Sequence, residues 1–239
     1  MSTIRDVAKL AGVAPITVSR VINDSDYVKQ ETRERVDAAI EELGYIPNTL
    51  GLSLRSKKTM TLAVVITDIT NPFWTTVTRG IEDVAQANGY STILCNTDES
   101  EDKQEQYLQM LLRRRIDGIL LVPSSSNPDP IKLVKKQNIP IVLMDRHVPE
   151  VDVDIVRSDS EEGAYLITKH LLSLGHQQIA MLSGPKNIST SVDRVNGYRQ
   201  ALQDAGLPTS DEKVFWGEYN KETGYKMAEE MLAKLPDVT

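Results

Sequence analysis

The sequence has little cysteine, few aromatic residues and no long apolar run, and each shortage excludes a class of protein. Cys95 is the single cysteine, so the chain forms no internal disulfide and no zinc site built on cysteines. The longest aliphatic runs, 62–66 and 119–122, fall far short of the ~20 apolar residues that a membrane span needs. No apolar stretch near the N-terminus resembles a secretory signal, so we expect a cytoplasmic location.

Motifs of common enzymes and cofactor sites are also missing. None of the 13 glycines lies two positions from another, no Gly-Lys pair occurs, and G-x-S-x-G is absent. The three histidines, His147, His170 and His176, lack the spacing of zinc ligands. Cys95 falls in an apolar segment, where a core residue is commoner than a nucleophile. We therefore predict a protein that is not an enzyme, with no catalytic residues, no metal and no cofactor.

Charge is distributed unevenly along the chain. The 27 Lys and Arg residues against 34 Asp and Glu give a net charge of −7. Residues 1–60 carry nine basic and eight acidic side chains, net +1, whereas residues 61–239 carry 18 and 26, net −8. A nucleic acid responds to the charge of the segment that contacts it, so the acidic total does not exclude a DNA-binding N-terminal segment.

From residue 61 onward, short apolar segments alternate with amphipathic ones of helical length. Strands are expected at 61–67, 91–97, 118–123, 140–145, 178–183 and 213–216. Helices are expected at 73–88, 101–115, 130–138, 161–174, 192–206 and 221–235. Strands without polar alternation, separated by helices, indicate a parallel sheet covered on both faces. The predicted fold is a doubly wound α/β domain.

Residues 1–46 instead show three apolar stripes with helical spacing and no strand pattern. The stripes are Ile4, Val7, Ala8 and Ala11; then Val18, Val21 and Ile22; then Val36, Ala39, Ile40 and Leu43. Only Gly12-Val13 interrupts the first two, a turn short enough to force a steep helix crossing. Thr3 is expected to cap the first helix, with Asp6 in its first turn, and Gly44 to end the third.

The second helix decides what this small α-helical domain does. Ile16, Thr17, Ser19 and Arg20 lie off its apolar stripe, and Pro15 suits its first position. Hydroxyl and guanidinium groups opposite a buried face fit the DNA major groove, where Arg pairs with guanine. The residues alone leave a second interpretation open, a plain bundle that serves as an oligomerisation cap.

Three longer segments carry a resemblance to a known family. They are TIRDVAKLAGVAPITVSRVIN at 3–23, TRERVDAAIEELGYIPN at 32–48, and GHQQIAMLSGP at 175–185; NPFW at 71–74 and DGILLVP at 117–123 extend the match. The chain resembles the lactose/galactose-repressor (LacI/GalR) family of bacterial transcription regulators along its whole length. That resemblance implies a helix-turn-helix headpiece at 1–46, a hinge at 47–60, and an effector-binding and dimerisation domain at 61–239. The last domain is similar to ribose-type periplasmic binding proteins, with a first lobe at 61–160 and a partial second lobe at 161–239.

The resemblance also implies which residues contact operator DNA. Base-reading positions fall on Pro15, Ile16 and Arg20. Backbone contacts fall on Thr17, Ser19, Asn23, Tyr27, Thr32, Tyr45 and Asn48. Where the family usually has a capping Ser the chain has Ala14, which costs about 1 kcal/mol of helix-end stability. Pro15 and Ile16 offer no side-chain hydrogen bond, so readout there is apolar, for instance Ile16 against a thymine methyl.

The hinge is expected to be helical only on DNA. Helices below ~12 residues are marginal in water, and Gly51 weakens this one by about 1 kcal/mol, so a flexible linker is expected in the free protein. The resemblance implies that two hinges of a dimer become helical together in the minor groove. Leu54 would then wedge between base pairs and Arg55 neutralise a phosphate.

Polar and aromatic residues follow three of the expected strands, where doubly wound sheets bind ligands. These candidate effector contacts are Asn71, Phe73 and Trp74 after the first strand, Ser124 after the third, and Asp145 and Arg146 after the fourth. Rings beside an Asp-Arg pair suit a small polyol, although ordinary packing and a surface ion pair remain open from the residues alone. The resemblance favours sugar contacts and adds Arg194.

The function that these observations imply is a cytoplasmic, homodimeric repressor, which binds a pseudo-palindromic operator and responds to a small effector, a sugar. Two alternative functions stay open: a solute-binding protein without DNA function, and a regulator controlled by a phosphorylated protein partner. The residues also leave open which sugar binds, and whether the effector is instead a purine or a phosphorylated compound. Family members usually run about 100 residues further, so the chain is expected to be truncated within its second lobe, which leaves dimerisation open.

Overall fold

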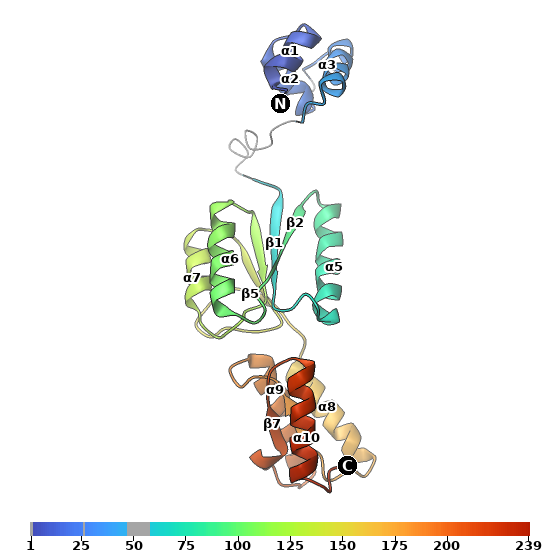
Figure 1. Cartoon of the computed structure of the whole chain (residues 1–239), viewed down its shortest axis with the longest axis vertical. Helices are drawn as coiled ribbons and strands as arrows, with labels where there is room; N and C mark the ends of the chain where they lie inside the picture. The colour runs from blue at the N-terminus through green and yellow to red at the C-terminus, as the bar shows by residue number, and fades with distance from the viewer. Residues whose placement is uncertain (1, 26, 47–57) are drawn as a thin grey trace. The chain divides into compact units, whose positions relative to one another are not determined.

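The computed structural model describes residues 2–25, 27–46 and 58–239 (Figure 1). Its contacts divide the chain into two compact units, Met1–Thr59 and Met60–Thr239. Asn48, Leu54 and Arg55, and most of the predicted hinge, lie outside the described residues. We call the first unit the headpiece and the second the effector unit.

Three helices form the headpiece, as their apolar stripes predict: α1 (Ile4–Ala11), α2 (Pro15–Ile22) and α3 (Gln30–Leu43). The three predicted stripes meet in one core, in which Val7, Val18 and Val36 are completely buried. Gly12, which ends α1, has φ of 65°, a left-handed conformation that glycine adopts without steric cost. Gly12 therefore allows the tight turn that the sequence predicted between α1 and α2.

The ends of the headpiece helices show one satisfied cap and one missing cap. Thr3 and Asp6 form a complete capping box at α1, so that prediction is confirmed. Ala14 has the extended conformation of a capping residue but makes no side-chain bond to α2. The segment after α2 is held by Arg33, which donates to the Asp24 carboxylate at 2.8 Å and to the Ser25 carbonyl oxygen at 3.2 Å.

The larger sheet of the effector unit is parallel, with strand order β2-β1-β3-β4-β5. Its strands are β1 (Thr61–Ile66), β2 (Ser91–Asn96), β3 (Gly118–Leu121), β4 (Ile141–Met144) and β5 (Asp154–Val156). Helices α6 (Glu101–Arg113) and α7 (Asp129–Lys136) cover one face, and α5 (Pro72–Ala87) covers the other (Figure 1). Alternate residues of β1 serve both cores, because successive side chains of a strand point to opposite faces.

A second, two-stranded sheet pairs β6 (Met181–Ser183) with β7 (Val214–Trp216) in parallel. It is accompanied by α8 (Ser160–Ser173), α9 (Ser189–Asp204) and α10 (Lys221–Lys234), and the turn Asp211–Lys213 is a short 3-10 helix. Helices α8 and α9 cross closely at Gly197, where an added Cβ would lie 2.0 Å from the Glu161 carbonyl oxygen. Only glycine allows that crossing.

Two strand predictions differ from the structure. The strand expected at 178–183 is ordered as a strand only at Met181–Ser183, because β7 offers just three partners and the Ile179 carbonyl oxygen accepts instead from the Tyr198 hydroxyl at 2.7 Å. The sequence did not predict β5, an exposed three-residue edge strand that begins with Asp154. It is too short for a periodic pattern, and its pairing with β4 is what makes it a strand.

Within the part of the chain that the structure describes, we find no helix with the length and apolar character required to traverse a bilayer.

We expect Ala14→Ser to stabilise the headpiece by about 1 kcal/mol, because a serine hydroxyl would accept from an amide in the first turn of α2 that now lacks a side-chain partner. Amide hydrogen exchange of α2 in the full chain measures the gain. Thr3→Ala, which removes an existing cap, serves as the control and should lose a similar amount at α1. Unchanged or faster exchange in Ala14→Ser would contradict the missing-cap interpretation.

Candidate DNA-binding helix and effector cavity

One side of α2 is available to a partner molecule. Ile16 is 58% exposed, and Pro15 and Arg20 are also exposed, while Val18 and Val21 on the opposite side are buried in the headpiece core. The apolar stripe therefore holds the helix in place and leaves the predicted base-reading residues outside.

The predicted DNA-backbone contacts have varied surroundings. Thr17, Ser19 and Thr32 are half-buried, Tyr27 is 92% exposed, and Tyr45 packs partly against the headpiece core. The Asn23 side-chain amide donates to the Ser19 carbonyl oxygen at 2.6 Å, so this amide helps to end α2. Hydroxyl and amide groups at the ends of α2 and at the start of α3 are of the kind that contacts phosphate oxygens.

The effector unit contains a cavity of about 620 Å³, which we call the effector cavity. Its lining comes from segments that follow β1, β2, β4, β5 and β7 and from the first two turns of α5 and α9. The lining residues are Thr67, Asp68, Thr70, Asn71, Phe73, Trp74, Asp98, Glu99, Asp145, Arg146, Ser158, Thr190, Arg194, Glu218, Tyr219 and Asn220. The cavity thus lies where strands of parallel sheets end, the usual ligand-binding edge of such folds.

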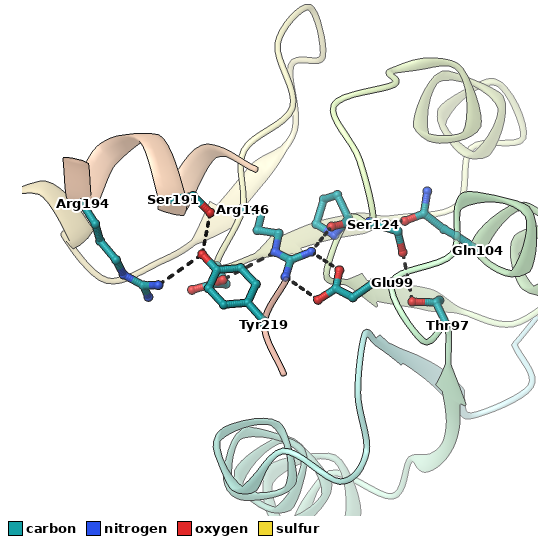
Figure 2. A network of polar contacts seen from close by, with 10 residues as sticks. Thr97, Glu99, Gln104, Ser124, Arg146, Ser191, Arg194 and Tyr219 are labelled. Atoms are coloured by element: carbon teal, nitrogen blue, oxygen red, sulfur yellow. Dashed lines mark hydrogen bonds and ion pairs between the residues drawn. The ribbon is translucent and has the colours of Figure 1, made fainter. Parts of the chain in front are cut away.

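An ion pair between a buried arginine and a half-buried glutamate joins two of these segments (Figure 2). Arg146, whose side chain is only 5% exposed, donates two parallel hydrogen bonds to the Glu99 carboxylate, at 2.6 and 2.7 Å. Its Nη1 also donates to the Pro123 carbonyl oxygen at 3.0 Å. Its Nε is buried with no hydrogen-bond partner, and the Asp145 carboxylate lies 3.9 Å away. Most of the donor capacity of Arg146 is therefore used within the protein.

Tyr219 stands at the centre of a second group of contacts (Figure 2). Its hydroxyl lies 2.6 Å from the Ser191 hydroxyl and accepts from Arg194 Nη1 at 3.3 Å. The guanidinium of Arg146 lies 5.8 Å from the ring centroid, within cation–π range. Sequence reasoning did not single out Tyr219, although its place three residues after the last residue of β7 is the same signal that identified the residues after β1 and β4.

The structure brings six of the seven predicted effector residues to the cavity. Phe73 is 53% exposed and meets Trp74 edge to face, with centroids 4.8 Å apart, whereas Trp74 is mostly buried in the core. The Asn71 side-chain oxygen Oδ1 caps α5 by accepting from the Phe73 amide. Ser124 does not line the cavity: its buried hydroxyl lies 2.9 Å from that of Thr97, and its amide donates to Gln104.

Asp145 combines backbone strain with partial burial. Its φ is 64°, a left-handed conformation uncommon for residues other than glycine, and Asp98 and Glu99 share it at 51° and 57°. Burial raises the pKa of the Asp145 carboxyl above its usual value, an effect that the nearby Arg146 and Arg194 charges oppose. Strained residues that persist beside a cavity are typical of functional sites.

Comparison with known proteins decides the family. Residues 59–239 match the family described as "Periplasmic binding proteins and sugar binding domain of LacI family", and residues 3–48 match "Bacterial regulatory proteins, lacI family". The chain belongs to the LacI family. A member with the family's headpiece is a DNA-binding transcription regulator and not an enzyme, which also excludes a solute-binding protein without DNA function.

Relatives of known role support this assignment. The HTH-type transcriptional repressor PurR of Aliivibrio salmonicida is 38% identical over 233 residues, which are 97% of this chain and 70% of the relative. A lac repressor dimer bound to operator and the anti-inducer ONPF has a TM-score of 0.83 at 26% identity, over 98% of this chain and 70% of that one. A CelR–cellobiose complex has a TM-score of 0.70 at 33% identity, over 100% and 72%. This LacI-family chain therefore resembles characterised regulators in both sequence and fold.

We expect Glu99→Gln to destabilise the effector unit by about 2 kcal/mol, because the buried Arg146 loses its two-fold bond to an ionised carboxylate and keeps only the more distant Asp145 at 3.9 Å. Urea unfolding followed by tryptophan fluorescence reports this unit alone, since both tryptophans, Trp74 and Trp216, lie in it. Glu222→Gln is the control: its pair with Lys226 is exposed and is worth about 0.5 kcal/mol. Equal losses in the two variants would refute the buried pair.

Proposed function

We propose that this LacI-family regulator represses transcription by binding a pseudo-palindromic operator as a homodimer in the cytoplasm, under the control of a small effector, a sugar, bound in the effector cavity. The observation that carries the proposal is the combination of two features in one chain. One is a short helix with its base-reading side exposed, and the other is a cavity at the strand ends with aromatic and hydrogen-bonding groups on its walls.

The DNA half of the proposal rests on α2. Its burial pattern exposes Ile16 and Arg20 together, so an apolar group and a guanidinium would meet adjacent base pairs in the major groove. Arg20 favours guanine through two parallel hydrogen bonds, and Ile16 favours the methyl group of thymine. The half-site therefore contains a guanine and a thymine at fixed spacing.

The effector half rests on the cavity. An exposed ring of Phe73 covers an apolar C–H face of a sugar, while Asp145 and Arg194 face its hydroxyls. Binding that favours one arrangement of the walls shifts the protein between operator-binding and released states, by an amount equal to the difference in ligand affinity. The CelR–cellobiose complex shows a sugar bound by a protein with 33% identity to this chain.

We expect a single thymine-to-uracil change in the half-site to weaken operator binding about fourfold, because it removes one methyl group from contact with Ile16. An operator selected from random duplexes and labelled for fluorescence anisotropy provides the measurement. Ile16→Ala should abolish the difference between the thymine and uracil operators, while Leu10→Ala, an exposed apolar residue of α1, should preserve it. A preference for thymine that survives in Ile16→Ala would refute this role, and no preference for any symmetric site over random duplex would refute operator binding itself.

The proposal extends to the hinge, where Leu54 lies outside the described residues. We expect Leu54→Ala to lower both operator affinity and operator bending, because apolar wedges kink DNA by about 20 to 90°. Energy transfer between labels at the operator ends measures the bend, and headpiece hydrogen exchange checks that the fold is retained. Unchanged bending would contradict the wedge.

A further inference from the structure

The turn after α2 has an arrangement in which glycine is the usual residue. The Asp24 amide donates to the Val21 carbonyl oxygen at 3.0 Å, and the Ser25 amide donates to the Arg20 carbonyl oxygen at 2.9 Å. This pair of bonds is the Schellman motif, in which the residue after the C-cap takes a left-handed conformation. That residue is Asp24, with φ of 52°, a conformation that costs an aspartate more than a glycine. The end of α2 is therefore stabilised by any contact that favours this conformation.

Arg33 of α3 supplies such contacts. Its Nη1 donates to the Asp24 carboxylate at 2.8 Å and to the Val21 carbonyl oxygen at 3.4 Å, and its Nη2 donates to the Ser25 carbonyl oxygen at 3.2 Å. The Asp24 side chain is 92% exposed, and an exposed ion pair contributes little by itself. The bonds to the two carbonyl oxygens matter more, because a cation is favoured at the C-terminal end of a helix. One guanidinium thus spans the whole turn.

Two of the predicted DNA-backbone contacts lie at this turn. Asn23 directly precedes Asp24, and Tyr27, which follows the turn, is 92% exposed and accessible to a phosphate. The Arg33 side chain is only 22% exposed, and three of the five N–H groups of its guanidinium are used by the turn. Arg33 is therefore better placed to fix the turn than to contact DNA.

We infer that Arg33 is a positioning residue for operator recognition: it fixes the turn after α2, and with it Asn23 and Tyr27, without contacting DNA itself. The inference rests on the proposed operator binding and adds a residue that acts from outside the DNA interface. Hydrogen bonds to phosphate oxygens set the register of a protein on the duplex, so their geometry also affects base readout by α2. A loosened turn therefore weakens specific binding more than non-specific binding, which depends on charge alone.

Substitution of Arg33 tests its effect on specificity. Fluorescence anisotropy of the full chain measures affinity for the selected operator and for random duplex. We expect Arg33→Gln to lower operator affinity about tenfold more than random-duplex affinity, and Arg33→Lys, which keeps the charge but not the planar fork, to restore part of the ratio. Arg35→Gln, which removes an exposed arginine of the same helix, is the control and should leave the ratio unchanged. An unchanged ratio in Arg33→Gln would overturn the inference.

The salt dependence of operator binding separates positioning from a direct phosphate contact. The log–log salt slope falls in magnitude by about 0.9 for each phosphate that an arginine or lysine no longer neutralises. Asn23 and Tyr27 are uncharged, so the loss of their positioning should leave the slope of Arg33→Gln within about 0.3 of the wild type. A slope smaller by about 0.9 would place Arg33 on a phosphate and overturn the inference.

A double-mutant cycle tests whether Arg33 acts through Tyr27. Tyr27→Phe removes only the exposed hydroxyl and should lower operator affinity about three- to fivefold when Arg33 is present. In Arg33→Gln the same change should cost less than about twofold, because the hydroxyl is no longer held at its phosphate. A loss of equal size in both backgrounds, or no loss in either, would overturn this route.

Amide hydrogen exchange of the DNA-free chain checks the turn itself. We expect Arg33→Gln to speed exchange at the Asp24 and Ser25 amides about tenfold, while the amides of α1 exchange as in the wild type. Exchange that rises equally in α1 and in the turn would assign Arg33 to overall stability and overturn the inference. A wild type that binds no operator would overturn the proposed function and this inference with it, whereas results confined to the variants concern Arg33 alone.

Discussion

The effector unit depends on how the charge of Arg146 is accommodated. A guanidinium that is almost fully buried is tolerated only with an ionised partner in good geometry, and Glu99 supplies it through two parallel hydrogen bonds. That pair ties the segment after β2 to the segment after β4 and so sets the wall of the cavity. Glu99 and Asp145 both have a left-handed backbone, and both line the cavity. The buried charge of Arg146 therefore fixes how two segments of the cavity wall are placed.

The two units differ in the kind of surface that they offer to a partner molecule. The headpiece is small, and its core of short apolar side chains leaves the reading side of α2 free for an external partner. The larger sheet of the effector unit has an apolar core on each face, a third core lies around β6 and β7, and together they support a concave site at the strand ends. DNA recognition needs protruding groups, whereas selection of a small molecule needs groups that are held in place around a space.

Much of this architecture was predictable because its causes are local. Apolar spacing predicted the three headpiece helices and the alternation of strands and helices, and Thr3 and Gly44 marked helix ends. The errors arose where pairing partners decide the outcome, as in the short β6 and the unpredicted β5. Among site residues, strand-end positions identified Asp145 and Phe73, but the same rule also selected Ser124, whose hydroxyl is used by Thr97. The position of a residue at a strand end does not tell whether its side chain faces the cavity or bonds to another residue of the protein.

By itself the sequence determined the class of each element, the presence of a headpiece before an α/β unit, and the family, because these depend on residue spacing and on motifs of neighbouring residues. Only the tertiary structure decided which polar groups remain free for a ligand. Glu99 and Arg146 are 47 residues apart, and Tyr219 is 25 residues from Arg194, yet their contacts assign most of the available donors. Hydrogen bonds and ion pairs form between groups that the fold brings together. Which polar groups are paired therefore depends on their distances in the folded structure and not on their separation along the chain.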